Sequence, residues 1–298
     1  INAGGITGPI IINVEPNSGP YVEQVSFGQI LNSSATNTIT INGNGNTLQF
    51  LSTNTNERAT LKLNGSSYVT VNNLIVKALG EISGEFGWAV WLTNGANYNT
   101  FDNCEFHAST TSTATNFAGF VTSNSATGAV TAGLAANYLT IKNSKSIGGY
   151  YGIVVNGPTS APFSTNNLIE NNEILDFSLY GLYLRGQNNS VFTDNIIGRP
   201  TRTTTGSLYM LYITQNMSGS KVENNIINNF SPGVATTSTV YGVYGTTITA
   251  SVGQELLIAN NVIYGLQNVN GPQYGLYMLT TNNTKFYHNT VSMDNTSQ

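Results

Sequence analysis

Charged residues are scarce in this sequence, making up only 8% of its 298 residues. The net charge of -4 arises from 10 basic and 14 acidic residues that are thinly spread. No basic patch can neutralise a row of phosphates, so we expect no nucleic-acid partner. No run of about 18 apolar residues occurs, and we therefore expect no insertion into a membrane.

Cysteine and helix-forming residues are also scarce. Cys104 is the single cysteine, which excludes an internal disulfide. Lys and Glu are few, whereas Asn, Thr and Gly, which form helices poorly, are abundant. We therefore expect an almost all-β chain. The sequence opens at "INAGGITGPI" without Met or a signal-like segment, so we expect a fragment of a longer protein.

A short aromatic motif recurs along the chain. Its first position is always aromatic, its second is Gly or Ala in six of seven copies, and its fourth is aromatic in six. The copies are "WAVWL" at 88, "FAGFV" at 117, "YGIVV" at 151, "YGLYL" at 180, "YMLYI" at 209, "YGVYG" at 241 and "YGLYM" at 274. A fainter copy, "TLKLN" at 60, places Lys62 in the fourth position.

A second motif alternates with the first, reading apolar, any, Asn or Asp, any, any, apolar. It includes "VNNLIV" at 71, "IENNEI" at 169, "VENNII" at 222 and "FYHNTV" at 286, with a period of 23 to 40 residues. Such self-similarity indicates a solenoid. Short alternating strands predict an all-β, single-domain parallel β-helix of about ten rungs over residues 1–298. Residues 1–50 would form the first, capping rungs and 51–298 the regular rungs.

Stacking the rungs predicts columns of equivalent residues. One column aligns five Asn amides, which can bond in series and tolerate a left-handed turn: Asn172, Asn195, Asn225, Asn261 and Asn289. Two further columns carry alternating charge on three successive rungs: Asp102, Lys142 and Glu170, and Glu105, Lys145 and Glu173. Opposite charges on neighbouring strands attract, so we interpret these columns as stabilising rather than as an acid/base cluster.

The beginning of the chain resembles the pectin lyase-like superfamily of right-handed parallel β-helices. Pro16, Gly19, Tyr21 and Glu23 in "IIINVEPNSGPYVEQVSF" carry this resemblance, followed by "TITINGNGNTLQF". The Gly/Asn/Thr-rich repeats are also similar to modules of large secreted bacterial surface proteins. The resemblance implies the fold, whereas an activity has to be argued from the site.

Enzymes of this fold would require clustered carboxylates or a basic residue on an outward face. The outward positions after the aromatic motif are Thr93, Thr122, Asn156, Arg185, Thr214, Thr246 and Leu279, and they include no carboxylate. Arg185 is the one candidate base for a lyase, with Asp176 or Asp194 nearby. The alternative is a structural Arg185, lying over Tyr183 or Tyr212 and bonded to loop carbonyls.

Neither the two histidines nor any set of possible metal ligands indicates a functional site in the sequence. His107 and His288 are too far apart in the repeat to act together, and His288 replaces an Asn of its column. We predict no metal site and no cofactor, and calcium is not indicated.

The fourth position of the aromatic motif predicts a ladder of rings. If Leu182 and Leu184 face inward, Tyr183 faces outward. The candidate ligand-binding residues are Trp91, Phe120, Tyr183, Tyr212, Tyr244 and Tyr277. Two interpretations of the rings are open: they bind a glycan, or they only stack on one another beneath loop insertions.

Three hypotheses follow for function. The first is a non-enzymatic module of an extracellular or cell-surface protein, bacterial in origin, that acts in adhesion or contacts a polysaccharide or cell-surface glycan. The second is a polysaccharide lyase or related carbohydrate-active enzyme. The third is a structural spacer or filament segment. The open strand edges at the ends of the coil also predict end-to-end contact with neighbouring domains.

Overall fold

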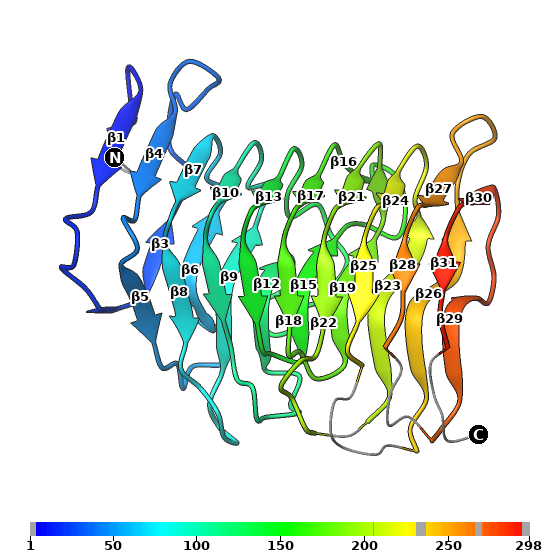
Figure 1. Ribbon diagram of the computed structural model, residues 1–298. Coiled ribbons are helices and arrows are strands. Elements are labelled where there is room, and N and C mark those ends of the chain that lie inside the picture. Colours follow the sequence, from blue (N-terminus) through cyan, green and yellow to red (C-terminus); the bar gives the residue numbers. More distant parts are fainter. Residues whose placement is uncertain (1–3, 205, 231–236, 266–269, 294–298) are drawn as a thin grey trace.

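The computed structural model is an all-β solenoid, and it describes residues 4–204, 206–230, 237–265 and 270–293. Parallel strands from successive rungs lie side by side along the coil (Figure 1). The three long sheets contain ten, ten and nine strands, which gives about nine turns. The predicted right-handed parallel β-helix is thereby confirmed. The described residues include no helix with the length and apolar character needed to span a membrane.

We name the long sheets A, B and C. Sheet A contains β1 (Ile10–Asn13), β4 (Ile39–Asn42), β7 (Val69–Asn72), β10 (Thr100–Asp102), β13 (Thr140–Lys142), β17 (Leu168–Glu170), β21 (Val191–Thr193), β24 (Lys221–Glu223), β27 (Leu256–Ala259) and β30 (Thr284–Tyr287). Sheet B contains β2 (Tyr21–Val22), β5 (Thr47–Phe50), β8 (Ile75–Ala78), β11 (Glu105–His107), β14 (Lys145–Ile147), β18 (Glu173–Leu175), β22 (Ile196–Gly198), β25 (Ile226–Asn228), β28 (Val262–Ile263) and β31 (Thr290–Val291).

Sheet C holds the aromatic motif. It contains β3 (Val25–Phe27), β6 (Ala59–Asn64), β9 (Gly87–Thr93), β12 (Phe117–Thr122), β15 (Tyr151–Asn156), β19 (Tyr180–Arg185), β23 (Leu208–Asn216), β26 (Val240–Thr249) and β29 (Gln273–Met278). A separate short sheet pairs β16 (Ser164–Thr165) with β20 (Gln187–Asn188).

The core runs along the axis between the three sheets. Each sheet contributes inward columns because alternate side chains of a strand point to opposite faces. In sheet A one inward column begins at Ile12, continues through Val71 and Ile141, and ends at Phe286. Val71 and Ile141 are fully buried, whereas Phe286 is exposed because it belongs to the last rung.

The predicted Asn ladder forms inside the corner between sheets A and B. Each side chain from Asn172 to Asn261 donates from Nδ2 to Oδ1 of the next Asn, over 2.9–3.0 Å. Each Oδ1 also accepts the backbone N–H of the preceding ladder residue, over 3.0–3.1 Å. The ladder therefore satisfies buried polar groups that would otherwise cost free energy.

The left-handed residues of this corner correct one detail of the prediction. They lie one position before the ladder residues, at Asn171, Asp194, Asn224, Asn260 and His288, with φ between 52° and 59°. The ladder residues are not in the left-handed group. Separate residues thus make the turn and satisfy the buried hydrogen bonds, and His288 occupies the turn column as expected.

The two charge columns have the predicted register. Asp102, Lys142 and Glu170 pair across β10, β13 and β17, and Lys142 Nζ lies 3.3 Å from Asp102 Oδ2. In sheet B, Lys145 Nζ lies 3.0 Å from Glu173 Oε2. These side chains are partly exposed, so each pair contributes only about 0.2–1 kcal/mol.

Candidate functional site

The most distinctive surface of the chain is a double column of tyrosines on sheet C. Each of the strands β19, β23, β26 and β29 contributes one tyrosine to each column. The register aligns Tyr180, Tyr209, Tyr241 and Tyr274 in one column, and Tyr183, Tyr212, Tyr244 and Tyr277 in the other.

Two consecutive inward residues between the two tyrosines place both rings on the outward face. Gly242 lies inside, where an added Cβ would sit 2.8 Å from Ile263 Cγ2 and 2.6 Å from the Gly275 carbonyl oxygen. Val243, the next residue, is also fully buried. Two consecutive inward residues break strict alternation, so Tyr241 and Tyr244 emerge on the same face although they are three positions apart.

The rings stack within each column along the axis of the coil. Their centroids are 4.9–5.1 Å apart from Tyr180 to Tyr274 in the first column and 4.9–5.5 Å apart in the second. Parallel rings in direct face-to-face contact would lie about 3.5–4.0 Å apart, so these rings are offset and part of each face remains uncovered.

The two columns are inclined to each other. The Tyr209 and Tyr212 planes meet at 83°, and the Tyr241 and Tyr244 planes meet at 72°. Edge-to-face and offset-stacked contacts are both favourable for aromatic rings. The columns therefore form a rigid, mutually supported surface rather than a set of free side chains.

Exposure of this surface changes along the coil. Toward the N-terminal end Trp91 and Tyr183 are only 4% and 8% exposed. They belong to a second apolar cluster, outside the main core, which the 126–130 segment joins through Ala126, Ala129 and Val130. The outward face is thus covered as far as β15, and on β19 Tyr183 is covered whereas Tyr180 is half-buried. The candidate residues Trp91 and Tyr183 are buried where the sequence predicted exposed rings.

Tyrosines beyond β19 retain exposed area. Tyr274 is 37% exposed, and its neighbours in both columns are half-buried. We call the six tyrosines of β23, β26 and β29 the tyrosine face: Tyr209, Tyr212, Tyr241, Tyr244, Tyr274 and Tyr277. Three of them, Tyr212, Tyr244 and Tyr277, were predicted candidates.

Phe120 does not belong to the outward column. Its partners in the register are Val90 and Ile153, both of the inward column, and its side chain is fully buried. Val121 is the residue that pairs with Trp91. The predicted alignment of "FAGFV" is therefore wrong by one residue, and a one-residue slip moves a side chain to the other face.

Arg185 makes the carbonyl hydrogen bonds that belong to the structural alternative to a lyase base. Its Nη2 donates to the Val130 carbonyl over 2.6 Å, and its Nε donates to the Gly157 carbonyl over 3.4 Å. Arg185 thereby ties the covering segment to β19. Neither candidate partner is engaged there: Asp176 accepts from Thr201 and Arg202, and Asp194 accepts from Thr193.

Burial keeps three hydroxyls of the tyrosine face protonated at neutral pH. It raises the pKa of Tyr212 to about 12, and the neighbouring Tyr183 and Tyr244 add to the shift. Burial also raises the pKa of Tyr209 and Tyr241. These three side chains therefore present neutral hydroxyl groups, each able to donate or accept a hydrogen bond.

Threonine and glutamine side chains border the second column. Thr214 pairs with Thr246 in the strand register, and Thr214 Oγ1 lies 3.0 Å from Thr247 Oγ1. Gln215 Nε2 donates to Thr247 Oγ1 over 3.3 Å. None of the residues in β23, β26 and β29 is Lys, Arg, Asp or Glu. The surface is thus uncharged and rich in hydroxyls.

Sequence reasoning missed half of this face. Strict alternation assigns only the fourth position of the motif to the outside, which omits Tyr209, Tyr241 and Tyr274. The Gly between the two tyrosines was the available signal, because a residue without a side chain permits a bend.

A second aromatic stack was also missed. Tyr68, Tyr98 and Tyr138 stack at 4.7 and 4.4 Å at the corner before sheet A. All three have φ between 53° and 60°, which is uncommon for a bulky residue. Asn166 and Asn189 take the corresponding left-handed conformation in the next two rungs.

The histidines form no common site. His107 Nε2 lies 2.7 Å from Glu105 Oε2, whereas His288 makes the turn of the last rung. Over residues 4–204, 206–230, 237–265 and 270–293, no group of three or more His, Cys, Asp or Glu side chains is placed to hold a metal ion.

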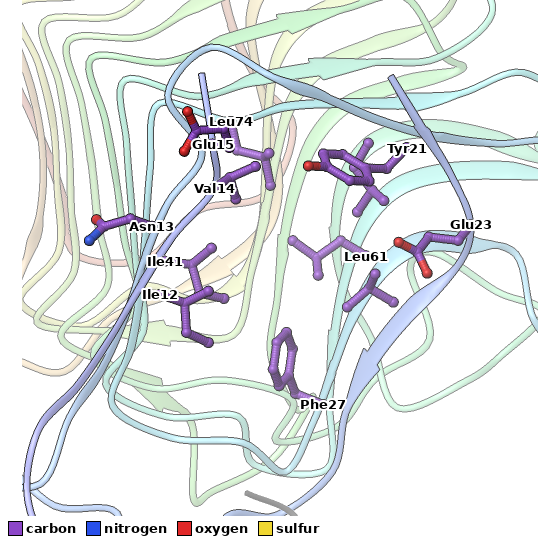
Figure 2. Close-up of a pocket in the computed structure, with 12 residues that line it drawn as sticks. Ile12, Asn13, Val14, Glu15, Tyr21, Glu23, Phe27, Ile41, Leu61 and Leu74 are labelled. Carbon is purple, nitrogen blue, oxygen red and sulfur yellow. The ribbon is translucent and has the colours of Figure 1, made fainter. Parts of the chain in front are cut away.

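A pocket of about 360 Å³ opens at the N-terminal end of the coil. Figure 2 shows the apolar side chains of Ile12, Ile41, Leu61 and Phe27 converging on it. They belong to the inward columns of the first rungs, so this pocket is the open end of the core rather than a built catalytic site.

Comparison with known proteins relates the chain to other β-helices. The family model described as the right handed beta helix region matches residues 128–297. No curated protein matches the sequence. Three solved structures share the fold at low identity.

Pectate lyase Pel9A has 13% identity and a TM-score of 0.48, with 98% of this chain and 70% of that chain covered. The Streptococcus pneumoniae surface protein and adhesin PfbA has 13% identity and a TM-score of 0.46, with coverage of 97% and 84%. An alginate lyase from Paenibacillus sp. str. FPU-7 has 15% identity and a TM-score of 0.45, with coverage of 90% and 99%. These structures differ in activity, so the likeness concerns the fold alone. The family match covers more than half of the sequence, and the chain therefore belongs to the right-handed β-helix family.

Proposed function

We propose that this chain is a non-enzymatic module of a secreted or cell-surface bacterial protein, and that its tyrosine face makes adhesive contact with a glycan. The observation that carries the proposal is the pair of stacked tyrosine columns on an uncharged face. Contiguous exposed aromatic surface of this kind often marks an interaction site.

The chemistry of the face suits a sugar chain. Tyrosine combines an apolar ring, which packs against the C–H groups of a sugar, with a hydroxyl that bonds to sugar hydroxyls. The rings are already held by their neighbours, so binding costs little side-chain entropy. A face that contacts glycans also suits a protein that lies outside the cell, where such glycans occur.

The lyase alternative is less well supported. A lyase needs a group that accepts a proton from the substrate, and an arginine side chain stays protonated. Arg185 already donates to two backbone carbonyls that hold the covering segment. The spacer alternative predicts that the tyrosines contribute to stability and bind nothing.

A binding panel tests the proposal. Affinity electrophoresis through gels that contain neutral or uronic-acid polysaccharides should show retardation by at least one polymer. Tyr244→Ala should weaken this retardation about tenfold or more. Tyr98→Ala, in the other exposed tyrosine stack, is the matched control and should not change it.

Folding and catalysis are checked in the same samples. Tyr244→Phe preserves the ring and should keep the stack, so it separates loss of a contact from loss of the fold. Retardation by none of the polymers, or retardation that Tyr244→Ala leaves unchanged, would overturn the proposal. Unsaturated product in the ultraviolet that disappears in Arg185→Ala would establish the lyase instead.

A further inference from the structure

We infer that the glycan is a neutral, extended chain that lies parallel to the coil axis, with about one sugar unit per rung. This inference rests on the proposed function and specifies the ligand of the same face. Two observations carry it: the absence of charge along this part of the sequence, and the equal spacing of the rings.

The charge distribution argues against an acidic polymer. No charged residue occurs in the sequence between Glu223 and Glu255, or between Glu255 and Lys285. These two stretches contain β26 and β29 entirely. A uronic-acid chain carries a carboxylate on every unit, and desolvating a carboxylate without a cation is costly.

Arg185, the nearest cation of sheet C, does not neutralise such carboxylates. Arg185 lies one rung away on β19 and is engaged by the carbonyls of Val130 and Gly157. The tyrosine and threonine hydroxyls supply neutral hydrogen bonds, which match the hydroxyl groups of a neutral sugar. Selectivity for a neutral chain therefore follows from the lack of charged side chains on this face as well as from its hydroxyl groups.

The spacing of the rings fixes the direction of the chain. Successive centroids lie 4.9 and 5.1 Å apart in the first column and 5.3 and 5.5 Å apart in the second. One unit of an extended sugar chain has a comparable length. A chain along the axis would therefore meet the same pair of tyrosines at every unit.

One hydroxyl borders the second column at the middle rung. Thr246 on β26 is half-buried, whereas Thr214, its partner on β23, is buried and pairs with Thr247. A chain across the strands would meet only two rings, Tyr241 and Tyr244, before leaving the face. The repeated surface thus matches a repeated ligand only along the axis.

The covered part of sheet C sets a limit to the bound length. Tyr183 on β19 is 8% exposed beneath the segment that Arg185 holds. The chain can therefore contact the three rungs β23, β26 and β29, and further units add no contact with the tyrosine face.

Calorimetric titration with two oligosaccharide series tests the inference. Neutral β-linked oligosaccharides (xylose, glucose and galactose series) should bind more tightly with each added unit until the chain spans the three rungs, and then level off. Their affinity should not depend on salt, because no ion pair forms. Oligogalacturonates and oligoguluronates should bind about tenfold more weakly or worse.

A charge variant provides a matched test. Thr246→Lys places a cation beside the second column and replaces a neutral hydroxyl, so it should raise the affinity for oligouronates and lower the affinity for neutral chains. Tyr98→Lys, at the other tyrosine stack, should have no such effect.

The failure of this inference can be told apart from that of the proposed function. If oligouronates bind more tightly in a salt-sensitive way and Tyr244→Ala abolishes that binding, the neutral ligand is wrong and the glycan face stands. If affinity keeps rising beyond the length of three rungs, the axial placement is wrong. If neither series binds, or Tyr244→Ala changes nothing, both claims fall.

Discussion

The ionisation of the tyrosines reports directly on their environment. Burial raises the pKa of Tyr180, Tyr183 and Tyr212 above the ordinary value of 10.0, to about 12 for Tyr212. Burial penalises the phenolate, and neighbouring tyrosines that ionise would repel it further. The stack is therefore stable only while its hydroxyls remain protonated.

Alkaline pH should destabilise the chain through these tyrosines. Their pKa is raised in the folded state, so the folded state binds more protons than the unfolded state above pH 10. The stabilisation is fully present below pH 10 and is lost as the pH rises toward about 12. Urea unfolding at several alkaline pH values should show the free energy of unfolding falling in this window. Ultraviolet titration in which every tyrosine ionises near pH 10 would contradict the arrangement.

Each residue of the Asn ladder satisfies several buried groups at once. Asn225 Nδ2 donates to Asn261 Oδ1 over 2.9 Å and to the Phe192 carbonyl over 3.0 Å. Its Oδ1 accepts from the backbone N–H and the Nδ2 of Asn195. Removal of this side chain leaves buried donors and carbonyls without partners.

Asn225→Ala should therefore lower the free energy of unfolding by about 1–3 kcal/mol. Urea denaturation measures the change. Asn42 is the matched control, since it belongs to an outward ladder in which its Nδ2 donates to Asn13 Oδ1 over 2.7 Å at an exposed position. Asn42→Ala should cost under about 1 kcal/mol because water replaces the lost partner. Equal costs at the two sites would refute the role given to burial.

The strands of sheet C illustrate how one position can differ in the space around it from rung to rung. Gly242 of β26 lies so close to Ile263 of sheet B and to the Gly275 carbonyl that an added Cβ would clash with both. Met210 fills the corresponding place in β23 and is fully buried. Room for a side chain at this position therefore depends on the rung.

Gly242→Ala should destabilise the chain by about 1–3 kcal/mol, because the new Cβ would press against Ile263 and the Gly275 carbonyl. Thermal unfolding monitored by circular dichroism measures the effect. Gly8→Ala serves as the control, since no atom lies within 4 Å of the added Cβ. If Gly242→Ala is as stable as the parent protein, the strand has room for the added methyl group at this corner.

Some features of the strands and columns could be predicted from the sequence, and others could not. Alternating motifs with a regular order indicated the solenoid, the Asn ladder and the charge columns, because stacked rungs repeat the same environment. The slip at Phe120 was beyond reach: "FAGFV" fits the aromatic motif only in the register that the structure does not adopt, because Phe120 pairs with Val90 and Ile153 of the inward column.

The candidate site was harder to predict than the fold for two physical reasons. Two consecutive inward residues, Gly242 and Val243, override the strict alternation on which face assignments rest. The cover over Trp91 and Tyr183 comes from the 126–130 segment, whose contact with sheet C leaves no periodic pattern. Half of the tyrosine face was therefore missed, and three of the six predicted candidates, Trp91, Phe120 and Tyr183, are buried.

On the scale of the whole molecule, charge and tyrosine occupy different sheets of the coil. The ion pairs of Lys142, Lys145, Lys221 and Lys285 involve sheets A and B, whereas the late strands of sheet C present tyrosine and threonine without charge. Parallel stacking keeps this surface straight and rigid over several rungs. The same feature that builds the fold thus supplies a repeated surface for a repeated ligand.

Chemical footprinting of the tyrosines with and without a neutral polysaccharide tests the central claim most directly. The oxidation of each tyrosine by hydroxyl radicals is quantified by mass spectrometry on the unmodified chain. We expect protection at Tyr241, Tyr244, Tyr274 and Tyr277 and unchanged oxidation at Tyr98 and Tyr138, which are 42% and 41% exposed. Protection of Tyr98 and Tyr138 alone, or equal oxidation of all tyrosines in both samples, would contradict the account.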